Sequence, residues 1–381
     1  MKKKLIALAV AGAMTAPMAA LADMSVSGQL QTQIISTSGK NTSNAKGLHM
    51  TDGGAASGTN AGSWGALTIN ASEDLGGGLK ALAHYGFNIT TDNAAAGGNI
   101  GTRSAYVGIA GDFGAVLAGR MNHPYKTATI GYDPFVGTFM QARFSGGMGG
   151  IGGIGSEDFV EVIDGTNYDV TGSIGGQTNV LYGTELDNTL AYAGNFNGVK
   201  VVAGVIMDES PKGDKTNGKH AYAASVTVPA GPVEIAAAYA SLSEYGGGAK
   251  NTTAAKIGAK YSAGDLTIAG HYEMLDKGWT GKKGNVLFLS GSYAMGANTI
   301  SASMGRTSKE LIAMDLTAVS QLDSDDVRTD VAYSDDHATY AALGFSHAFS
   351  QKTNVFAGAR QTRIGSDYRD NSIGAGLRVR F

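Results

Sequence analysis

The chain ends on a segment, residues 371–381, in which apolar and polar side chains alternate without interruption. Because successive side chains of a β-strand point to opposite faces, this segment is expected to form a strand with one apolar face. The apolar positions are Ile373, Ala375, Leu377, Val379 and Phe381. A last strand with an open apolar edge would invite aggregation, whereas pairing with the first strand would close a barrel and remove that edge. The terminal segment therefore predicts a closed barrel if the rest of the chain supplies its other strands.

Short turn-forming segments divide the chain between stretches of alternating polarity. They are rich in Gly, Asn, Asp and Pro, the residues that join two strands in a hairpin. The seven short connections are 73–78, 111–114, 195–198, 229–232, 262–265, 295–298 and 350–353.

Longer connections alternate with the short ones. They cover residues 38–62, 92–101, 122–186, 208–218, 245–251, 277–284, 310–336 and 365–370. Seven short and eight long connections require sixteen strands, with both termini on the short-turn side. Short turns at one rim and long loops at the other are typical of transmembrane β-barrels. We therefore predict an all-β fold, a sixteen-stranded antiparallel transmembrane β-barrel, formed by residues 23–381.

Aromatic residues lie beside the predicted short turns, at the level where a barrel carries an interfacial girdle. They are Phe113, Phe196, Tyr261, Tyr293, Phe349 and Phe381. The alternative is that these are ordinary aromatic residues of a β-sheet.

The first 22 residues have the pattern of a cleaved secretory signal peptide. Lys2, Lys3 and Lys4 form a basic start, an apolar run follows, and residues 20–22 read Ala-Leu-Ala, a typical cleavage site. Cleavage would leave 26 basic against 32 acidic residues, a net charge near −6. This acidic balance gives no support to nucleic-acid binding. The chain has no cysteine, so packing and backbone pairing alone must hold an exported protein together.

The connection at 122–186 differs from the others because it is both very long and partly apolar. Such a segment is unstable when surrounded by water, so we expect this third long loop to fold inward against the barrel wall and narrow the lumen. The side chains that this would bury are Tyr132, Phe135, Phe139 and Met140.

Charged residues of this loop and of the wall are the candidate constriction. The expected acidic side consists of Asp133, Glu157 and Asp158, and the expected basic side of Arg103, Arg120 and Arg360. Lys126 and Arg143 are candidates for either side. Carboxylates opposite guanidinium groups would set a transverse field that filters solutes by charge and size. The alternative is that each of these charged side chains is simply exposed to solvent at the surface.

Catalytic and metal-binding signals are weak. The sequence has no Gly-x-Ser-x-Gly elbow, no phosphate-binding lysine loop and no His-Glu-x-x-His motif, and we expect no cofactor. His271 and Glu273 share one face of a predicted strand, which indicates a lumenal pair rather than a catalytic dyad. The acidic stretch from Asp323 to Asp336 resembles a calcium-binding cluster only loosely and is interpreted as a solvated loop.

Several motifs resemble those of the Gram-negative general porins. They are residues 72–81 (Ser-Glu-Asp-Leu-Gly-Gly-Gly-Leu-Lys-Ala), residues 106–114, the pair Gly119-Arg120, and the terminal Phe381. The resemblance implies an outer-membrane barrel, usually a homotrimer, with a constricting third loop and a terminal aromatic strand, ending in Phe381, read by the barrel assembly machinery. It also matches Arg103 and Arg120 to basic wall positions. The sequence departs at Ala66, where a third wall arginine is common, and its third loop is unusually long, with room for an extra hairpin near residues 179–186.

The expected function is passive diffusion of ions and small hydrophilic solutes across the outer membrane, without chemistry. The main alternative is a substrate-specific channel with a binding track of Tyr125, Tyr132, Phe135 and Phe139. An outer-membrane enzyme would need a clustered His/Ser/Asp set that the sequence does not offer. An adhesin or structural barrel would depend on the loops 38–62 and 310–336.

Overall fold

A computed structural model describes fourteen stretches of the 381-residue chain. They are residues 23–40, 46–52, 65–91, 100–142, 156–163, 166–174, 185–207, 220–241, 253–277, 282–311, 313–318, 329–333, 336–366 and 368–381. The predicted signal peptide and the glycine-rich run 146–155 lie outside these residues.

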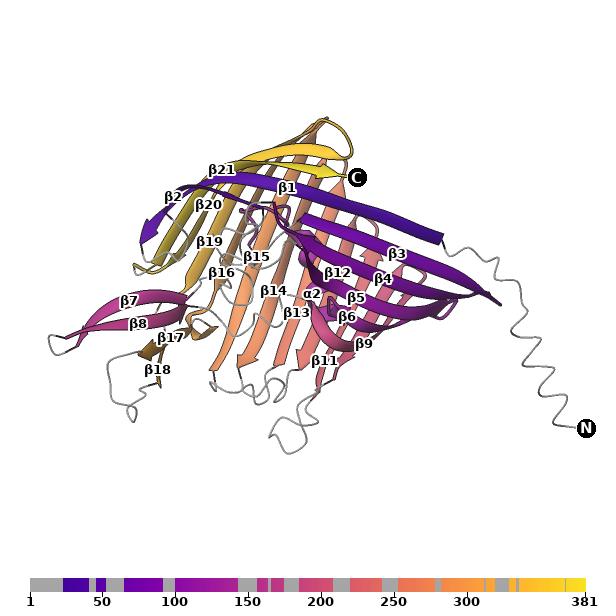
Figure 1. Cartoon of the computed structure of the whole chain (residues 1–381), viewed down its shortest axis with the longest axis horizontal. Coiled ribbons are helices and arrows are strands. Elements are labelled where there is room, and N and C mark those ends of the chain that lie inside the picture. Colours follow the sequence, from indigo (N-terminus) through magenta and orange to yellow (C-terminus); the bar gives the residue numbers. More distant parts are fainter. Residues whose placement is uncertain are drawn as a thin grey trace, which may run out of the picture.

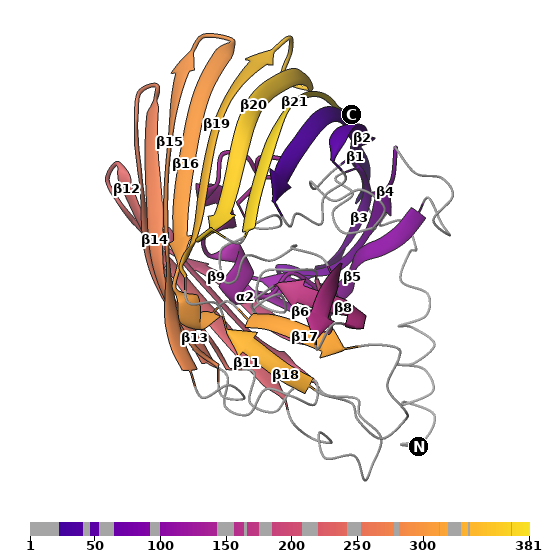
Figure 2. The ribbon, with the colours of Figure 1, turned by 90° about the vertical axis from the view of Figure 1, so that its left-hand side faces the viewer.

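Sixteen long strands form one antiparallel sheet that curves into a barrel (Figures 1 and 2). They are β1 (Asp23–Lys40), β3 (Gly65–Gly76), β4 (Leu79–Ile89), β5 (Ile100–Gly111), β6 (Gly114–Met121), β9 (Leu186–Phe196), β10 (Val199–Ile206), β11 (Ala221–Ala230), β12 (Val233–Ser241), β13 (Thr253–Ala263), β14 (Leu266–Lys277), β15 (Lys282–Met295), β16 (Asn298–Thr307), β19 (Ala338–Ala348), β20 (Thr353–Ile364) and β21 (Tyr368–Arg380). The predicted fold class and strand number are confirmed.

The barrel closes where the last strand meets the first. β21 pairs with β1 from Arg380 opposite Gln29 to Arg369 opposite Lys40. At the end of the chain, the Phe381 N–H donates to the Gly28 carbonyl at 3.0 Å and the Gly28 N–H donates back at 3.1 Å. On its other side β1 pairs with β3 along residues 23–29 and with the short β2 (Gly47–Thr51) along residues 33–37. The terminal edge is therefore fully paired, as the alternating segment predicted.

Each of the seven predicted short connections joins two neighbouring strands in a hairpin. Several need a backbone that favours glycine or asparagine: φ is 52° at Asn197 and 91° at Gly198, in the turn between β9 and β10. The strand ends that the eight longer connections join lie at the opposite rim, as the sequence predicted.

The strands separate an apolar outer face from a polar inner face. Outward side chains such as Val107, Leu343 and Ile373 are 60–64% exposed, whereas the inward Gln33 and Glu273 are fully buried. The six predicted girdle aromatics are all 39–64% exposed beside the short turns. An apolar surface outside and hydrogen-bonded polar groups inside is the pattern of a membrane-spanning barrel.

A second, four-stranded sheet is built from two of the long connections. It contains β7 (Ser156–Ile163), β8 (Thr166–Ile174), β17 (Ala313–Ala318) and β18 (Thr329–Tyr333), in the order β18-β17-β8-β7. The extra hairpin of the third loop therefore forms at 156–174, earlier than the range near 179–186 expected from the sequence. β8 pairs with β17, so two loops distant in sequence are joined by backbone hydrogen bonds.

Helical structure is limited to short elements in the described residues. They are α2 (Pro124–Thr127), the 3-10 turn η1 (Ile130–Tyr132) and the 3-10 turn η3 (Lys309–Leu311). Within the described part of the chain, no helix has the length and apolar character needed to cross a membrane.

Candidate functional site

Residues 122–142, called the inner segment below, leave β6 and run along the inside of the barrel. Figure 2 shows α2 within the ring of strands. Its large side chains are almost completely buried: Tyr125 and Phe139 are 0% exposed, Met140 1%, Tyr132 3% and Phe135 4%. The four side chains that the sequence expected to be buried by an inward loop are therefore all buried.

The inner segment has its own compact backbone structure. Pro124 begins the single turn of α2, where its fixed φ fits and no N–H is needed. The two carboxylate oxygens of Asp133 accept the N–H groups of Phe135 and Ala142, each at 2.9 Å. The side chain of Gln141 accepts the N–H of Gly137 at 2.7 Å. These short-range bonds satisfy backbone groups that no sheet partner could reach.

Glycines on the barrel wall make room for the inner segment. A Cβ at Gly344 would lie 2.6 Å from the Phe135 ring and 3.0 Å from the Met140 sulfur. A Cβ at Gly258 would meet the Tyr132 ring at 2.8 Å, and one at Gly358 would overlap the Met140 sulfur. The close approach of loop and wall therefore depends on three positions without side chains.

The first half of the inner segment is held through side chains of β13, β14 and β15, here called the carboxylate anchor. The Tyr125 hydroxyl donates to Glu273 Oε2 at 3.1 Å, and the Ser290 hydroxyl donates to the Tyr132 carbonyl at 2.6 Å. Lys256 lies 4.0 Å from the Tyr125 ring centroid and 3.9 Å from Glu273. His271 Nε2 lies 2.8 Å from the same carboxylate, as its shared strand face predicted.

Burial keeps the two loop tyrosines protonated. Desolvation, followed by the charge of Glu273, raises the pKa of Tyr125 well above its usual value. Desolvation, followed by the charge of Glu234, raises the pKa of Tyr132 to about 12. Each phenol is therefore neutral at physiological pH, and Tyr125 can act as the hydrogen-bond donor to Glu273.

The second half is held mainly through its backbone carbonyls, by a set of wall side chains called the guanidinium anchor. Arg360 donates to the Phe139 carbonyl at 3.1 Å, and Arg378 donates to the Gly137 carbonyl at 2.8 Å. Three further wall side chains bind the segment: Gln31 donates to the Gly137 carbonyl at 2.5 Å, Gln33 accepts the Phe139 N–H at 2.8 Å, and the Tyr340 hydroxyl donates to the Met140 carbonyl.

The predicted charged residues of the inner segment and of β20 occupy structural positions. Both carboxylate oxygens of Asp133 accept backbone N–H groups, and the Lys126 side chain is only 5% exposed. Arg360 is 2% exposed and pairs with Asp370 at 2.5 Å, a partner that sequence reasoning missed. Lys126 and Arg360 are therefore almost completely buried, whereas Asp133 is half-buried.

Arg103 and Arg120 lie at irregularities in their strands. The β4–β5 register skips Arg103, and the β6–β9 register shifts at Arg120. Because a β-bulge interrupts the two-residue alternation, the directions of these two side chains do not follow from strand parity. Arg103 pairs with Glu185 at 3.4 Å, Arg120 pairs with Asp187 at 2.9 Å, and Arg120 also donates to the Arg103 carbonyl at 3.0 Å.

Two of the remaining predicted charges lie in the small sheet, and the third is not described. Glu157 and Asp158 lie on β7 of the small sheet, opposite Gly172 and Thr171 of β8. Arg143 lies outside the described residues. Among the described side chains, the structure joins Arg360 with the inner segment and Arg103 with Arg120.

The anchoring residues of the wall were not identified from the sequence, apart from Arg360 and the pair His271 and Glu273. The signal that could have identified the others is their position, because all of them occupy inward places in alternating strands. They are Gln31, Gln33, Ser290, Tyr340 and Arg378. Among the described residues, no three His, Asp or Glu side chains are grouped as metal ligands would be.

Comparison with known proteins agrees with this architecture. A family model described as Gram-negative porin matches residues 7–366. The chain is 30% identical over 151 residues to the major outer membrane protein P.IA of Neisseria meningitidis, strain H44/76. That match covers 35% of this chain and 37% of the relative, so the aligned part spans little more than a third of the curated relatives.

Solved structures share the fold at low sequence identity. The anion-selective porin from Comamonas acidovorans has a TM-score of 0.65 at 19% identity, covering 94% of this chain and 100% of that one. The in-vitro folded OmpT of Vibrio cholerae, in a trimer form, has a TM-score of 0.60 at 14% identity, covering 94% and 99%. With the family model matched across most of its length, the chain belongs to the Gram-negative porins.

Proposed function

We propose that the chain forms a water-filled channel in the outer membrane for passive diffusion of ions and small hydrophilic solutes. A barrel of sixteen strands is wide enough to leave an aqueous lumen. The inner segment narrows that lumen and sets the size limit. No catalytic step is part of this function.

The observation that carries the proposal is the docking of residues 122–142 on the inner wall of a closed barrel. The segment is held by hydrogen bonds from both anchors and by buried aromatic side chains. A segment fixed in this way narrows the channel permanently, whereas a mobile plug would open and close it.

A substrate-specific channel with an aromatic binding track is disfavoured by burial. Tyr125, Tyr132, Phe135 and Phe139 are at most 4% exposed, so their rings pack against the wall and are not available to a solute. The same residues explain instead how the inner segment stays in place.

The paired arginines support weak ion selectivity at the wall. Arg103, Arg120 and Arg360 each lie within 3.4 Å of a carboxylate, so their charges are largely compensated locally. The transverse field proposed from the sequence, with Asp133, Lys126, Arg143, Glu157 and Asp158 as its other members, is therefore weakened at these three positions. We propose that size rather than charge is the main filter.

Assembly is also proposed by analogy with the family. The chain would be exported through cleavage of residues 1–22, folded by the barrel assembly machinery through its terminal strand and Phe381, and associated as a homotrimer. Phe381 is 51% exposed on the outer face next to β1, so its ring is accessible to another protein.

Single-channel conductance in a planar bilayer tests the proposed function. Replacing residues 128–139 by a short Gly/Ser linker should increase both the conductance and the largest solute that passes. The matched control shortens the hairpin 156–174, which leaves the inner segment intact and should leave both values unchanged. An unchanged conductance in the first variant would contradict the role of the inner segment.

A further inference from the structure

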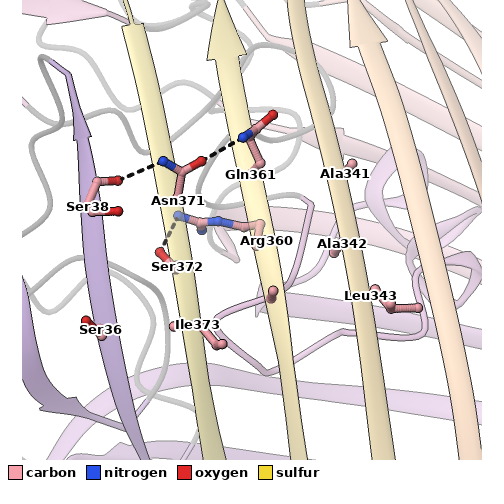
Figure 3. Close-up of a pocket in the computed structure, with 11 residues that line it drawn as sticks. Ser36, Ser38, Ala341, Ala342, Leu343, Arg360, Gln361, Asn371, Ser372 and Ile373 are labelled. Atoms are coloured by element: carbon pink, nitrogen blue, oxygen red, sulfur yellow. Dashed lines mark hydrogen bonds between the residues drawn. The ribbon is translucent and has the colours of Figure 1, made fainter.

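The inner segment contacts the wall from β10 to β15 and from β19 through β21 to β1. The inward side chains beneath it are almost completely buried, with Glu273 0% and Ser290 9% exposed. Arg360, which donates to Ser372 at 3.3 Å (Figure 3), is 2% exposed. The inward polar side chains of β3, β4 and β5 are only half-buried. We call the inward face of β3 to β6 the open wall, and we expect passing solutes to contact it.

His84 of β4 lies on the open wall. The next residue, Tyr85, is exposed on the outer face, so strand alternation directs His84 toward the lumen. A Cβ at the inward Gly86 would lie 3.4 Å from His84 Nε2 and 2.6 Å from Ser104 Oγ, so these groups share one face. The imidazole stacks on the Tyr106 ring, with the ring centroids 4.5 Å apart and an angle of 11° between the planes. The ring is therefore held in one orientation while it remains half-buried.

The two hydrogen-bond partners of His84 fit both of its protonation states. Nδ1 lies 2.7 Å from the amide oxygen of Asn70, which can only accept, so Nδ1 carries a hydrogen. Nε2 lies 2.8 Å from the Ser104 hydroxyl. That hydroxyl donates to Nε2 of the neutral ring and, after rotation, accepts from the Nε2–H of the protonated ring. Binding a proton therefore breaks neither hydrogen bond and requires no movement of the backbone.

The other ionisable groups of β3 to β6 lie against the ring, in ion pairs, at the short-turn rim or on the outer face. They are, in that order, Tyr106; Arg103 with Glu185 and Arg120 with Asp187; Glu73, Asp74 and Lys80; and Tyr85. In the described part of the chain, no carboxylate forms an ion pair with His84. A proton bound by His84 therefore adds a positive charge to the open wall, whereas the charges of the two arginines are already paired.

The other histidines on strands of the large sheet are placed differently. His271 is 7% exposed beneath the inner segment, with its Nε2 2.8 Å from Glu273. His49 lies on the short β2 near the long-loop rim. His347 shares its strand parity with the outward Phe345, although its Nδ1 lies 2.8 Å from the Asn298 amide oxygen, much as His84 meets Asn70. His347 is therefore a matched control for His84 on the outer face.

We propose that His84 determines the ion selectivity of the channel in acid. With a neutral ring, the paired arginines leave size as the main filter. In mildly acidic solution imidazole binds a proton, and the open wall then favours small anions over cations. The inference rests on the proposed channel function and names the residue that makes its selectivity depend on pH.

Reversal potentials in a planar bilayer under a KCl gradient test the proposal, from about pH 8 to about pH 4.5, the range in which imidazole titrates. In the unchanged chain the permeability ratio of chloride to potassium should rise in acid. In His84→Gln, a neutral side chain that keeps a donor and an acceptor, the rise should be about threefold smaller, as one charge about 6 Å from an ion in water predicts. Wall carboxylates also bind protons in acid, but they do so equally in both chains. His347→Gln should behave as the unchanged chain does.

A second variant fixes the charge. His84→Lys should show at about pH 8 the anion preference that the unchanged chain reaches only in acid, because an ammonium stays protonated there. Single-channel conductance at the same pH shows that each variant has folded into a barrel.

The outcomes separate the selectivity role from the channel function. An equal rise in His84→Gln and the unchanged chain would overturn the role of His84, as would a loss of the rise in His347→Gln. Conductance without any pH-dependent selectivity in the unchanged chain would overturn that role alone and leave the channel function standing. If the unchanged chain conducted at no pH, the channel function would fail, and the role of His84 with it.

Discussion

The two halves of the inner segment are attached to the barrel in different ways. Residues 124–132 depend mainly on their own side chains, because Tyr125 donates to Glu273 and Tyr132 packs over Gly258. Residues 135–142 offer mainly backbone carbonyls, and the wall supplies the side chains, chiefly Arg360, Arg378 and Tyr340. Loop substitutions should therefore loosen the first half, whereas wall substitutions should loosen the second.

The largest effect is expected at Arg360. Arg360→Ala would remove the guanidinium that pairs with the fully buried Asp370 and the bond to the Phe139 carbonyl. Breaking a buried ion pair in this way should lower the free energy of unfolding by about 3–5 kcal/mol. Urea-induced unfolding in lipid vesicles measures this change in the free energy of unfolding. The double variant Arg360→Met/Asp370→Leu should recover much of the loss, and if it does not, the pair is not the origin of the effect.

A second expected effect comes from overpacking between wall and loop. Gly344→Val should push Phe135 and Met140 away from the wall. Even the Cβ atom of the new side chain would lie within 3.1 Å of both. Overpacking of this kind costs about 1–3 kcal/mol. We expect a larger single-channel conductance as the second half moves. Gly291→Ala is the control, since its Cβ would meet nothing closer than 3.8 Å. Equal conductance in the two variants would mean that the loop does not move.

Two tyrosine substitutions compare the halves directly. Tyr125→Phe removes the hydroxyl that donates to the buried Glu273, which should cost about 1–3 kcal/mol. Tyr340→Phe removes one of several bonds to the second half, so we expect about 1 kcal/mol or less. Hydrogen exchange should rise in residues 124–132 for the first variant and little in 135–142 for the second. The reverse order would contradict the division into two anchors.

The smallest effect is a weaker attachment of the inner segment to the barrel wall at alkaline pH. The pKa of Tyr132 is raised from 10 in the unfolded chain to about 12, so its neutral form favours the docked state. That contribution is complete below pH 10 and is lost as the pH rises toward 12. Phenolate absorbance should show a late-titrating tyrosine that is missing in Tyr132→Phe. Conductance noise in the unchanged chain should increase over the same range, and an identical increase in Tyr132→Phe would exclude this residue as its cause.

The sequence was sufficient for the barrel because each strand is encoded locally. Alternation along one strand fixes which side chains face lipid, and Gly and Asn mark the turns, so the seven hairpins and the sixteen strands follow from short windows. The terminal segment also required a partner strand, which led correctly to closure between β21 and β1.

The functional region was decided by tertiary structure. Arg360 lies near Asp370 because β20 and β21 pair in one register, and no local pattern signals that this pair is buried beneath Phe139. Arg103 and Arg120 lie at irregularities, where alternation loses its predictive value. The pairing of β8 with β17 joins residues more than a hundred positions apart. The sequence by itself determined the wall, since strand and turn preferences act between near neighbours, whereas the partners of each charge depended on contacts that only the closed barrel creates.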